Sequence, residues 1–206
     1  MDLLDYSNRP SHGFKYIWHA QDHFSKWHFA AAISAKSAEE VKRCVQMMLT
    51  ITGPIPNLQC DNGGEFEAEV NALCTQWGMK MVKSSPYHPQ SNGLIERAGA
   101  VIKRGIAKWE EHNLSNDWSE PLYRLIHQLN CTATRTTRRS PYELVYGVKP
   151  RWDSVPLDGL DNTDLLELMA ADEHEDIAAA LLSDMGQNAT TRTPDAARVR
   201  LTPTYL

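Results

Sequence analysis

Three observations predict an α/β fold for this chain, a mixed sheet flanked by helices. Residues 1–33 hold three short runs of apolar, aromatic and β-branched residues, which are typical of strands. Further along, extended and helical patterns alternate, which is typical of parallel strands joined by helices. Beyond residue 151 the composition becomes acidic and rich in turn-forming residues. We therefore expect an α/β domain over residues 1–151, and an acidic helix with a disordered tail over residues 152–206.

The first three strands are predicted to form an antiparallel meander. They cover residues 1–6, 14–21 and 26–33, and short polar turns separate them. A helix is expected to begin at Ser37, because Glu40 stands three residues later and completes the sequence pattern of a capping box. Apolar residues then recur at the spacing of one helix face.

The rest of the domain is expected to alternate helices and strands. Short apolar runs indicate strands, and apolar residues three or four positions apart indicate helices. The expected elements are a buried strand at residues 57–60, a helix at 67–78, a strand at 79–83, a loop at 84–93, a long helix from about Asn92 to Trp109, a helix capped by Asp117 or Ser115 that ends near Cys131, and a short helix at 140–147.

The net charge at first argues against nucleic acid as a ligand. The chain holds 26 Asp and Glu against 21 Lys and Arg, a formal net charge of −5. Residues 1–150, however, carry 17 basic against 15 acidic residues, whereas residues 151–206 carry 4 against 11. The acidity therefore belongs to the tail, and the domain keeps enough basic residues for a local nucleic-acid surface.

Composition argues against two other classes of protein. No run approaches the roughly 18 apolar residues of a membrane span, and the N-terminus lacks the basic and apolar segments of a secretory signal. The four cysteines stand singly, without a C-x-x-C pair, which argues against a disulfide framework or a zinc knuckle. We expect an intracellular protein with reduced cysteines and no membrane contact.

Three carboxylates stand where a sheet-based metal site needs them. Asp61 directly follows the strand at residues 57–60, and open α/β sheets place ligand groups at such strand ends. Glu96 is expected in the first turn of the long helix, beside its apolar stripe, and Asp2 lies in the first strand. Carboxylate oxygens without nearby Cys or His favour a hard cation, Mg²⁺ or Mn²⁺. Simpler interpretations exist, because Asp61 precedes Asn-Gly as in a turn and Glu96 suits a helix N-terminus.

Several segments, read together, carry a resemblance to a known family. DNGGEF, followed by YHPQSNGLIER, resembles the catalytic core of retroviral and Ty3/gypsy-type retrotransposon integrases, which are polynucleotidyl transferases. KYIWHAQDHFSKW and the segment that ends in SPYELVYG extend the resemblance over about residues 1–151. It implies a ribonuclease H-like fold and three carboxylates that bind two divalent metal ions. It also implies 3′-end processing of element DNA and strand transfer into target DNA.

The resemblance assigns roles to the acidic residues. Asp2, Asp61 and Glu96 correspond to the catalytic residues and metal ligands of the family. Asp5 is the rival of Asp2, because residues three apart in a strand face opposite sides and only one of them can point at the site. Asp22 matches a common family residue that is no metal ligand, and we expect it to form a turn.

The predicted DNA contacts follow the loop and the long helix. Tyr87, Gln90 and Lys103 correspond to residues that touch the DNA end in the family. Arg97 and Lys108 add positive charge to the same helix, which suits the binding of phosphates. An ordinary solvated helix face is the alternative interpretation of these basic residues.

Two departures from the family bear on activity. The first strand is nearly missing upstream of Asp2, where strands of such sheets average five or six residues. Gly99 stands where the family usually has Asn, and a glycine inside a helix costs about 1 kcal/mol relative to alanine.

The expected function is therefore an integrase-type transferase with DNA as partner, which acts as a homo-oligomer in the nucleus. The alternative is a catalytically inactive module, derived from an element or recruited by a host, that binds nucleic acid or protein. A generic ribonuclease H activity fits less well, because DNGGEF and YHPQSNGLIER follow the integrase pattern.

Overall fold

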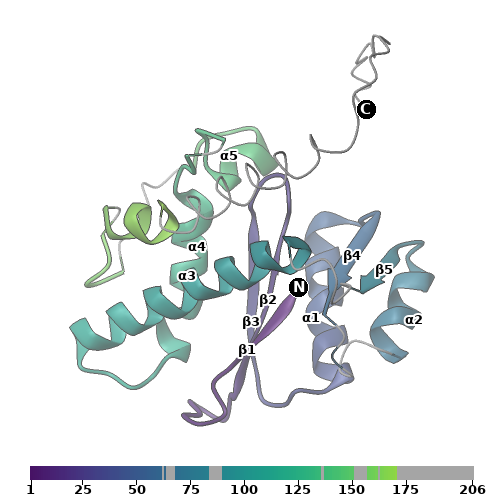
Figure 1. Cartoon of the computed structure of the whole chain (residues 1–206), viewed down its shortest axis with the longest axis horizontal. Coiled ribbons are helices and arrows are strands. Elements are labelled where there is room, and N and C mark those ends of the chain that lie inside the picture. The colour runs from purple at the N-terminus through teal and green to yellow at the C-terminus, as the bar shows by residue number, and fades with distance from the viewer. Residues whose placement is uncertain are drawn as a thin grey trace, which may run out of the picture.

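The computed structural model describes residues 1–61, 63, 68–83, 90–135, 137–150, 157–161 and 163–170. It confirms the α/β class, with strands and helices in the predicted order (Figure 1). The elements are β1 (Asp2–Asp5), β2 (Tyr16–Gln21), β3 (His28–Ile33), α1 (Ala38–Thr52), β4 (Asn57–Cys60), α2 (Ala68–Gln76), β5 (Lys80–Lys83), α3 (Gln90–Asn113), α4 (Ser119–Cys131) and α5 (Pro141–Tyr146).

The strands form a mixed arrangement around β1. β1, β2 and β3 are an antiparallel meander, in which Asp2 pairs with His19. β4 and β5 form a separate parallel pair. A hydrogen bond of 2.6 Å, from the Met1 amino group to the Gln59 carbonyl, places β4 beside the start of β1. The spatial order is therefore β3, β2, β1, β4, β5, with β1 at the centre.

Alternating side chains give the sheet two buried faces, because successive residues of a strand point to opposite sides. On one face, Trp18, Ile33 and Leu58 pack with the buried residues of α1 and α2. On the other face, Leu4 and Ile17 pack with α3 and α4. Figure 1 shows α3 crossing the strands on one side, with α1 and α2 lying beside β4 and β5. Helices therefore cover both faces of the sheet.

The capping signal at Ser37 predicted one helix start correctly, and the structure shows a second cap at the start of the predicted helix 140–147. The Ser37 hydroxyl accepts a hydrogen bond from the Glu40 amide at 3.3 Å, so that α1 begins where its cap was predicted. Ser140 and Glu143 form a complete capping box at the start of α5. Such caps are local, because the side chain satisfies backbone groups only three residues away.

Two helix predictions need correction. α3 begins at Gln90 and ends at Asn113, so Glu96 lies in its second turn and not in its first. α4 has Trp118 at its N-cap, without a side-chain cap, where Asp117 or Ser115 was predicted. Asp117 still accepts a hydrogen bond from the Ser119 amide at 3.1 Å, so it serves the helix start from one residue earlier.

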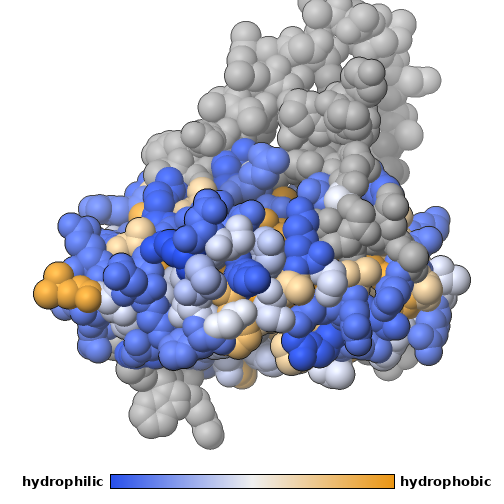
Figure 2. Space-filling view, turned by 90° about the horizontal axis from the view of Figure 1, so that it is seen from below, coloured by the Kyte–Doolittle hydropathy of each residue, from blue (hydrophilic) through white to orange (hydrophobic). Residues whose placement is uncertain are grey.

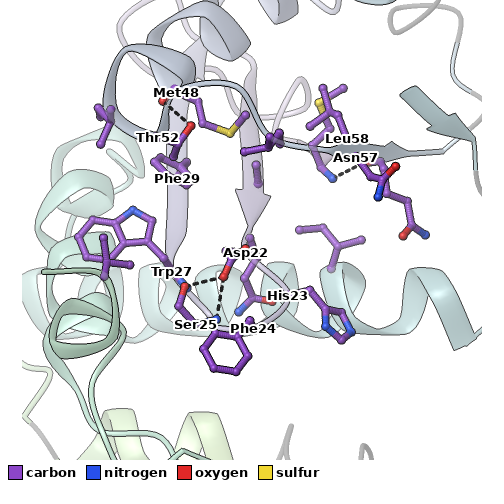
Figure 3. Close-up of a pocket in the computed structure, with 18 of the residues that line it drawn as sticks. Asp22, His23, Phe24, Ser25, Trp27, Phe29, Met48, Thr52, Asn57 and Leu58 are labelled. Atoms are coloured by element: carbon purple, nitrogen blue, oxygen red, sulfur yellow. Dashed lines mark hydrogen bonds between the residues drawn. The ribbon is translucent and has the colours of Figure 1, made fainter. Parts of the chain in front are cut away.

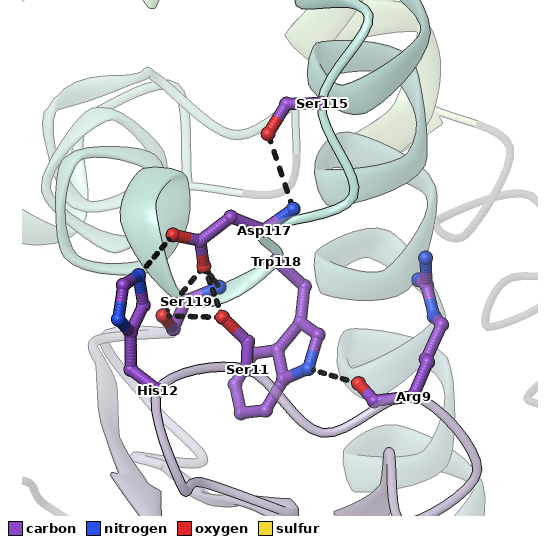
Figure 4. Close-up of polar contacts among 7 residues, drawn as sticks. All are labelled: Arg9, Ser11, His12, Ser115, Asp117, Trp118 and Ser119. Atoms are coloured by element: carbon purple, nitrogen blue, oxygen red, sulfur yellow. Dashed lines mark hydrogen bonds and ion pairs between the residues drawn. The ribbon is translucent and has the colours of Figure 1, made fainter.

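Asp117 also ties the β1–β2 loop to the start of α4 (Figure 4). Its carboxylate accepts hydrogen bonds from the Ser11 and Ser119 hydroxyls, and His12 Nε2 lies 2.6 Å from its other oxygen. Burial opposes the charged carboxylate, but these hydrogen bonds outweigh burial and hold the pKa of Asp117 well below its usual range. The loop is therefore fastened to a segment more than 100 residues away.

Trp118 and Glu110 add two further ties at this end of the molecule. Trp118 is fully buried and stacks against Tyr6, with ring centroids 4.7 Å apart. Its indole N–H donates to the Arg9 carbonyl at 2.8 Å, which Figure 4 also shows. The Arg9 guanidinium in turn bonds both carboxylate oxygens of the buried Glu110.

The described residues after 151 pack on the domain. Leu157, Leu160 and Leu165 are buried in the same apolar cluster as α3 and α4. Residues 163–170 are helical, within the region where an acidic helix was predicted, and Lys108 of α3 pairs with Asp164. The core therefore continues past residue 151, and the division at that residue stays a prediction.

The surface agrees with the composition. None of the helices in the described residues is long and apolar enough to cross a membrane. Figure 2 shows a face on which the described residues are mainly hydrophilic, with scattered hydrophobic side chains. All four cysteines are free thiols, three of them buried, as the sequence predicted.

Candidate active site

Asp2 lies on the central strand and faces α3. Met1 and Leu3 pack on the α1 face, so the alternation of the strand turns Asp2 to the same side as Leu4. Its carboxylate accepts a hydrogen bond from the Leu3 amide at 2.7 Å. Burial raises the pKa of Asp2, and the negative charges of Asp61 and Glu96 raise it further. Asp61 and Glu96 are therefore each close enough to Asp2 for their charges to act on its carboxylate.

Asp61 follows the last residue of β4, as predicted. Leu58 and Cys60 are buried and Asn57 and Gln59 are exposed, so β4 alternates and is not the fully buried strand that we expected. The Asp61 carboxylate accepts a hydrogen bond from the Gly63 amide at 3.0 Å, an Asx-type turn. Both interpretations of the sequence apply here, since Asp61 forms the turn and also lies next to the central strand.

Glu96 is an exposed side chain on α3, beside a row of buried residues. Ala98, Ile102 and Ile106 are almost completely buried and fix that face of the helix on the sheet. Glu96 therefore lies at the edge of the buried face, near enough to Asp2 for its charge to raise the pKa of that carboxyl.

Gly99 explains how α3 comes so close to β1. A Cβ atom at this position would lie 2.8 Å from Leu4 Cδ2, closer than packed atoms tolerate. The glycine that departs from the family pattern thus has a packing role in this chain. The sequence alone showed only its cost in helix propensity.

The rival residue, Asp5, points elsewhere. It is exposed and accepts a hydrogen bond from the Ser7 amide at 2.7 Å. Hydrogen bonds from Ser7 lower the pKa of Asp5, with smaller contributions from the charges of Lys36 and Lys103. Asp61 and Glu96 are not among the main influences on the pKa of Asp5, in contrast to that of Asp2. Asp22 has its expected turn role, because its carboxylate accepts hydrogen bonds from the Ser25 amide and hydroxyl, both at 2.7 Å.

The donor set fits a hard divalent cation. Asp2, Asp61 and Glu96 offer carboxylate oxygens, which Mg²⁺ and Mn²⁺ prefer. Burial is the main cause of the raised pKa of Asp2, and the charges of Asp61 and Glu96 add to it, so a cation bound there would favour the charged carboxylate. Among the described residues, however, no group of three His, Cys, Asp or Glu side chains is already arranged as a metal site.

The structure describes the side chains of only some of the predicted DNA contacts. Tyr87 and the side chain of Gln90 lie outside the described residues. Lys103 is exposed, and Arg97 is half-buried with its guanidinium against Gly93. Lys108 pairs with Asp164, a contact that the charge pattern of α3 could not reveal because the partner is 56 residues away.

Comparison with known proteins shows which proteins this chain resembles. Residues 1–89 match the family model described as the integrase core domain. The human KRAB-A domain-containing protein 2 is 30% identical over 154 residues, which are 74% of this chain and 31% of that protein. The Gag-Pol polyprotein of avian reticuloendotheliosis virus is 30% identical over 181 residues, 84% of this chain and 15% of the polyprotein. The chain thus spans a third or less of the length of these two relatives.

Solved structures agree on the fold. The catalytic core domain of BIV integrase superposes with a TM-score of 0.53 at 26% identity, covering 64% of this chain and 86% of that one. The magnesium complex of the HTLV-2 integrase catalytic core domain gives 0.53 at 17% identity, covering 64% and 83%, and shows the fold alone. The fold is thus the mixed α/β fold of integrases, which resembles ribonuclease H. The chain is thus similar to integrase catalytic cores, in sequence over residues 1–89 and in fold.

Proposed function

We propose that this chain is the core of an integrase-type polynucleotidyl transferase that processes DNA 3′ ends and joins them to target DNA. The proposal is supported by the positions of Asp2 on β1, Asp61 at the end of β4 and Glu96 on α3, together with the charges of Asp61 and Glu96, which add to burial in raising the pKa of Asp2. Carboxylates are brought together against their own repulsion when they hold cations. The DNA substrates are element ends and target DNA.

The carboxylates have separate structural duties in this proposal. Asp2 is fixed by the central strand, Asp61 by the turn after β4, and Glu96 by the face of α3 that packs on Leu4. These three would hold two divalent cations, Mg²⁺ or Mn²⁺. Two cations bound there would activate water or a DNA 3′-hydroxyl for attack and stabilise the leaving oxygen. No covalent bond to the protein is required.

The basic residues of α3 position the substrate. Lys103 is exposed two turns beyond Glu96, on the same side of the helix, where it meets a phosphate backbone. Arg97, Tyr87 and Gln90 are proposed as further contacts. Lys108 is the weakest candidate among the five proposed DNA contacts, because Asp164 already binds its ammonium group.

The deciding experiment is a disintegration and strand-transfer assay with labelled DNA ends and Mn²⁺. Asp61→Asn and Glu96→Gln should each lower the rate at least about 100-fold. Catalytic residues that act as one unit depend on one another, so the loss of one removes most of the rate enhancement. Glu111→Gln removes another exposed carboxylate of α3 and should keep the rate of the unchanged chain. Equal rates for all variants would mean that these carboxylates take no part in the reaction.

A second candidate function is a binding module without catalysis. The observation in its favour is the similarity to a human protein whose name records a different domain, KRAB-A, and of which this chain matches 31%. In that case we expect the chain to bind DNA tightly and to show no cleavage or joining of DNA with Mn²⁺. Asp61→Asn should then leave the affinity for DNA unchanged. Gel-shift and assay data on the same preparations separate the two functions.

We also propose that the protein works as a homo-oligomer in the nucleus, where its DNA substrates are. Light scattering coupled to size exclusion should give a mass of at least two chains. A tagged chain expressed in cells should concentrate in the nuclear fraction. A monomer at micromolar concentration, or an exclusively cytoplasmic signal, would contradict these two parts of the proposal.

A further inference from the structure

The described residues between 157 and 170 lie along the C-terminal half of α3. They contact it in reverse order of the sequence, so this segment runs antiparallel to the helix. The contacts join Arg104 Nη2 to the Leu168 carbonyl at 3.1 Å, Lys108 to the Asp164 carboxylate, the His112 ring to the backbone at Gly159, and Asn113 Nδ2 to the Asp158 carbonyl at 3.2 Å. Figure 1 shows the helical part of the segment, in yellow-green, near that half of α3.

Apolar side chains hold the segment in place. Leu157, Leu160 and Leu165 are almost completely buried, in the cluster that also contains the buried residues of α3 and α4. The Gln128 amide of α4 donates a buried hydrogen bond to the Leu160 carbonyl at 3.3 Å. Burial of three leucines stabilises a contact strongly, whereas exposed ion pairs contribute little. The position of the segment therefore does not depend on the charges that it carries.

The exposed side of the segment is acidic. Its described residues include no Lys or Arg, and their carboxylates belong to Asp158, Asp161, Asp164 and Glu167. The hydrogen bond to Asp164 raises the pKa of Lys108, and the charges of Asp164, Glu167 and Asp161 raise it further. These carboxylates thus act on one lysine of α3 together.

The N-terminal half of α3 has different neighbours. Leu94 and Ile95 line a cavity of about 680 Å³, and Asp22 is the one carboxylate among the described residues around it (Figure 3). Asp22 already accepts hydrogen bonds from the Ser25 amide and hydroxyl, which Figure 3 draws as dashed lines. The carboxylates of the candidate active site also lie at this half, and bound cations would offset their charge. A phosphate backbone would therefore meet less repulsion here than beside the acidic segment.

We propose that residues 157–170 are an acidic cover that keeps DNA off the C-terminal half of α3. This inference rests on the proposed function and adds to it the place where the DNA surface ends. Lys103 is exposed, whereas Arg104, the next residue, already donates to the cover. The boundary of the surface therefore falls between these two residues. DNA is confined to the half of the helix that carries Glu96.

The cover acts by competing with DNA for the same cation. Each contact of a lysine with a DNA phosphate releases counterions and adds about 0.9 to the slope of log affinity against log salt concentration. Lys108 makes no such contact while Asp164 binds it. A phosphate brought to Lys108 would also meet the charges of Asp161 and Glu167. A chain with a neutralised cover should therefore bind DNA more tightly and with a steeper salt dependence.

The experiment measures the affinity of the full chain for a short DNA duplex of random sequence, by fluorescence anisotropy with Mg²⁺ at several salt concentrations. Asp164→Asn should raise the affinity about fivefold and steepen the salt slope by about 0.9. Glu167→Gln leaves the pair of Asp164 and Lys108 in place and should raise the affinity about twofold. Glu39→Gln, at the start of α1, removes an exposed carboxylate with the same change in net charge, and should raise the affinity by less than either variant.

A double variant tests whether Lys108 carries the effect. In a chain that already has Lys108→Gln, Asp164→Asn should no longer raise the affinity, because the cation that it would release is gone. A gain that persists in that chain, or equal gains from Asp164→Asn and Glu39→Gln, would overturn the inference and leave the proposed function intact. Failure of every chain to bind the duplex would contradict the proposed function, and the inference with it.

Discussion

Two regions of the molecule differ in how their polar groups interact. The hairpin side, formed by β2, β3 and α4, fastens itself with hydrogen bonds between distant segments: Asn130 accepts from the His28 amide at 2.8 Å and donates to its carbonyl at 3.0 Å. The carboxylate edge, formed by β1 and the end of β4, places Asp61 and Glu96 near Asp2, and burial together with their charges raises the pKa of Asp2. The first arrangement stabilises the fold, and the second costs stability, as expected of the site that we propose.

The largest effect should come from removing a side chain that fastens the scaffold. Trp118→Ala takes away a fully buried indole and its bond to the Arg9 carbonyl, which should lower the free energy of unfolding by about 4 kcal/mol. Trp77 is 40% exposed, and Trp77→Ala should cost about 1 kcal/mol or less. Urea titration of both variants checks the difference, and similar losses would contradict it.

The hairpin side should also weaken in acid. Burial lowers the pKa of His28 to about 4 from its ordinary 6.5, and the buried His19 ring lies 3.1 Å from it. Between these pH values the unfolded chain takes up a proton that the folded protein refuses, so stability falls as the pH drops from 6.5 to 4 and is unaffected above that window. The loss from His28 is on the order of 3 kcal/mol.

A variant without this titration tests the assignment. His28→Gln should reduce the slope of the unfolding midpoint against pH between 6.5 and 4, and the buried His19, whose pKa burial also lowers, should supply the slope that remains. His23→Gln, which changes an exposed histidine of the neighbouring turn, should retain the full slope. The same slope in both variants would mean that groups other than His28 cause the loss of stability in acid.

Filling the close contact between α3 and β1 should have a moderate effect. Gly99→Ala gains helix propensity but forces a methyl group against Leu4, so the net loss should be about 1–2 kcal/mol. Leu4→Val frees space at the same point, and the double variant should recover part of the loss in a double-mutant cycle. Strictly additive losses would mean that the two residues do not meet.

The smallest effect should have the opposite sign. Burial and the neighbouring carboxylates raise the pKa of Asp2, so the folded protein binds a proton more readily than the unfolded chain, and the charged form costs stability above that pKa. Asp2→Asn should therefore raise the free energy of unfolding at pH 7 by about 1 kcal/mol in metal-free buffer. Asp5→Asn removes an exposed carboxylate and should not stabilise the protein. Calorimetry of both variants distinguishes the two residues.

Local signals in the sequence were enough for most of the fold. Runs of apolar, aromatic and β-branched residues predicted the meander, and Ser37 with Glu40 predicted the start of α1, because each signal depends on residues only a few positions apart. The predicted limits of α3, about Asn92 and Trp109, were wrong, because the helix begins at Gln90 and ends at Asn113. Helix ends carry weaker sequence patterns than helix centres.

The site could be predicted only in part. Alternation along β1 showed that Asp2 and Asp5 face opposite sides, but the position of α3 was needed to show which side holds Asp61 and Glu96. The charge pattern of α3 could not show that Asp164 binds Lys108. The packing role of Gly99 likewise depends on a contact with Leu4, 95 residues earlier in the chain. Each missed feature is a long-range contact, which local patterns do not encode.

The central claim is that Asp2, Asp61 and Glu96 hold divalent cations together, and Mn²⁺ titration followed by NMR tests it most directly. Paramagnetic broadening should reach the amide signals of all three residues over the same saturable concentration range. It should disappear from all three in Asp61→Asn and persist in Glu111→Gln. Broadening that spares one of the three residues, or that survives unchanged in Asp61→Asn, would contradict a shared metal site.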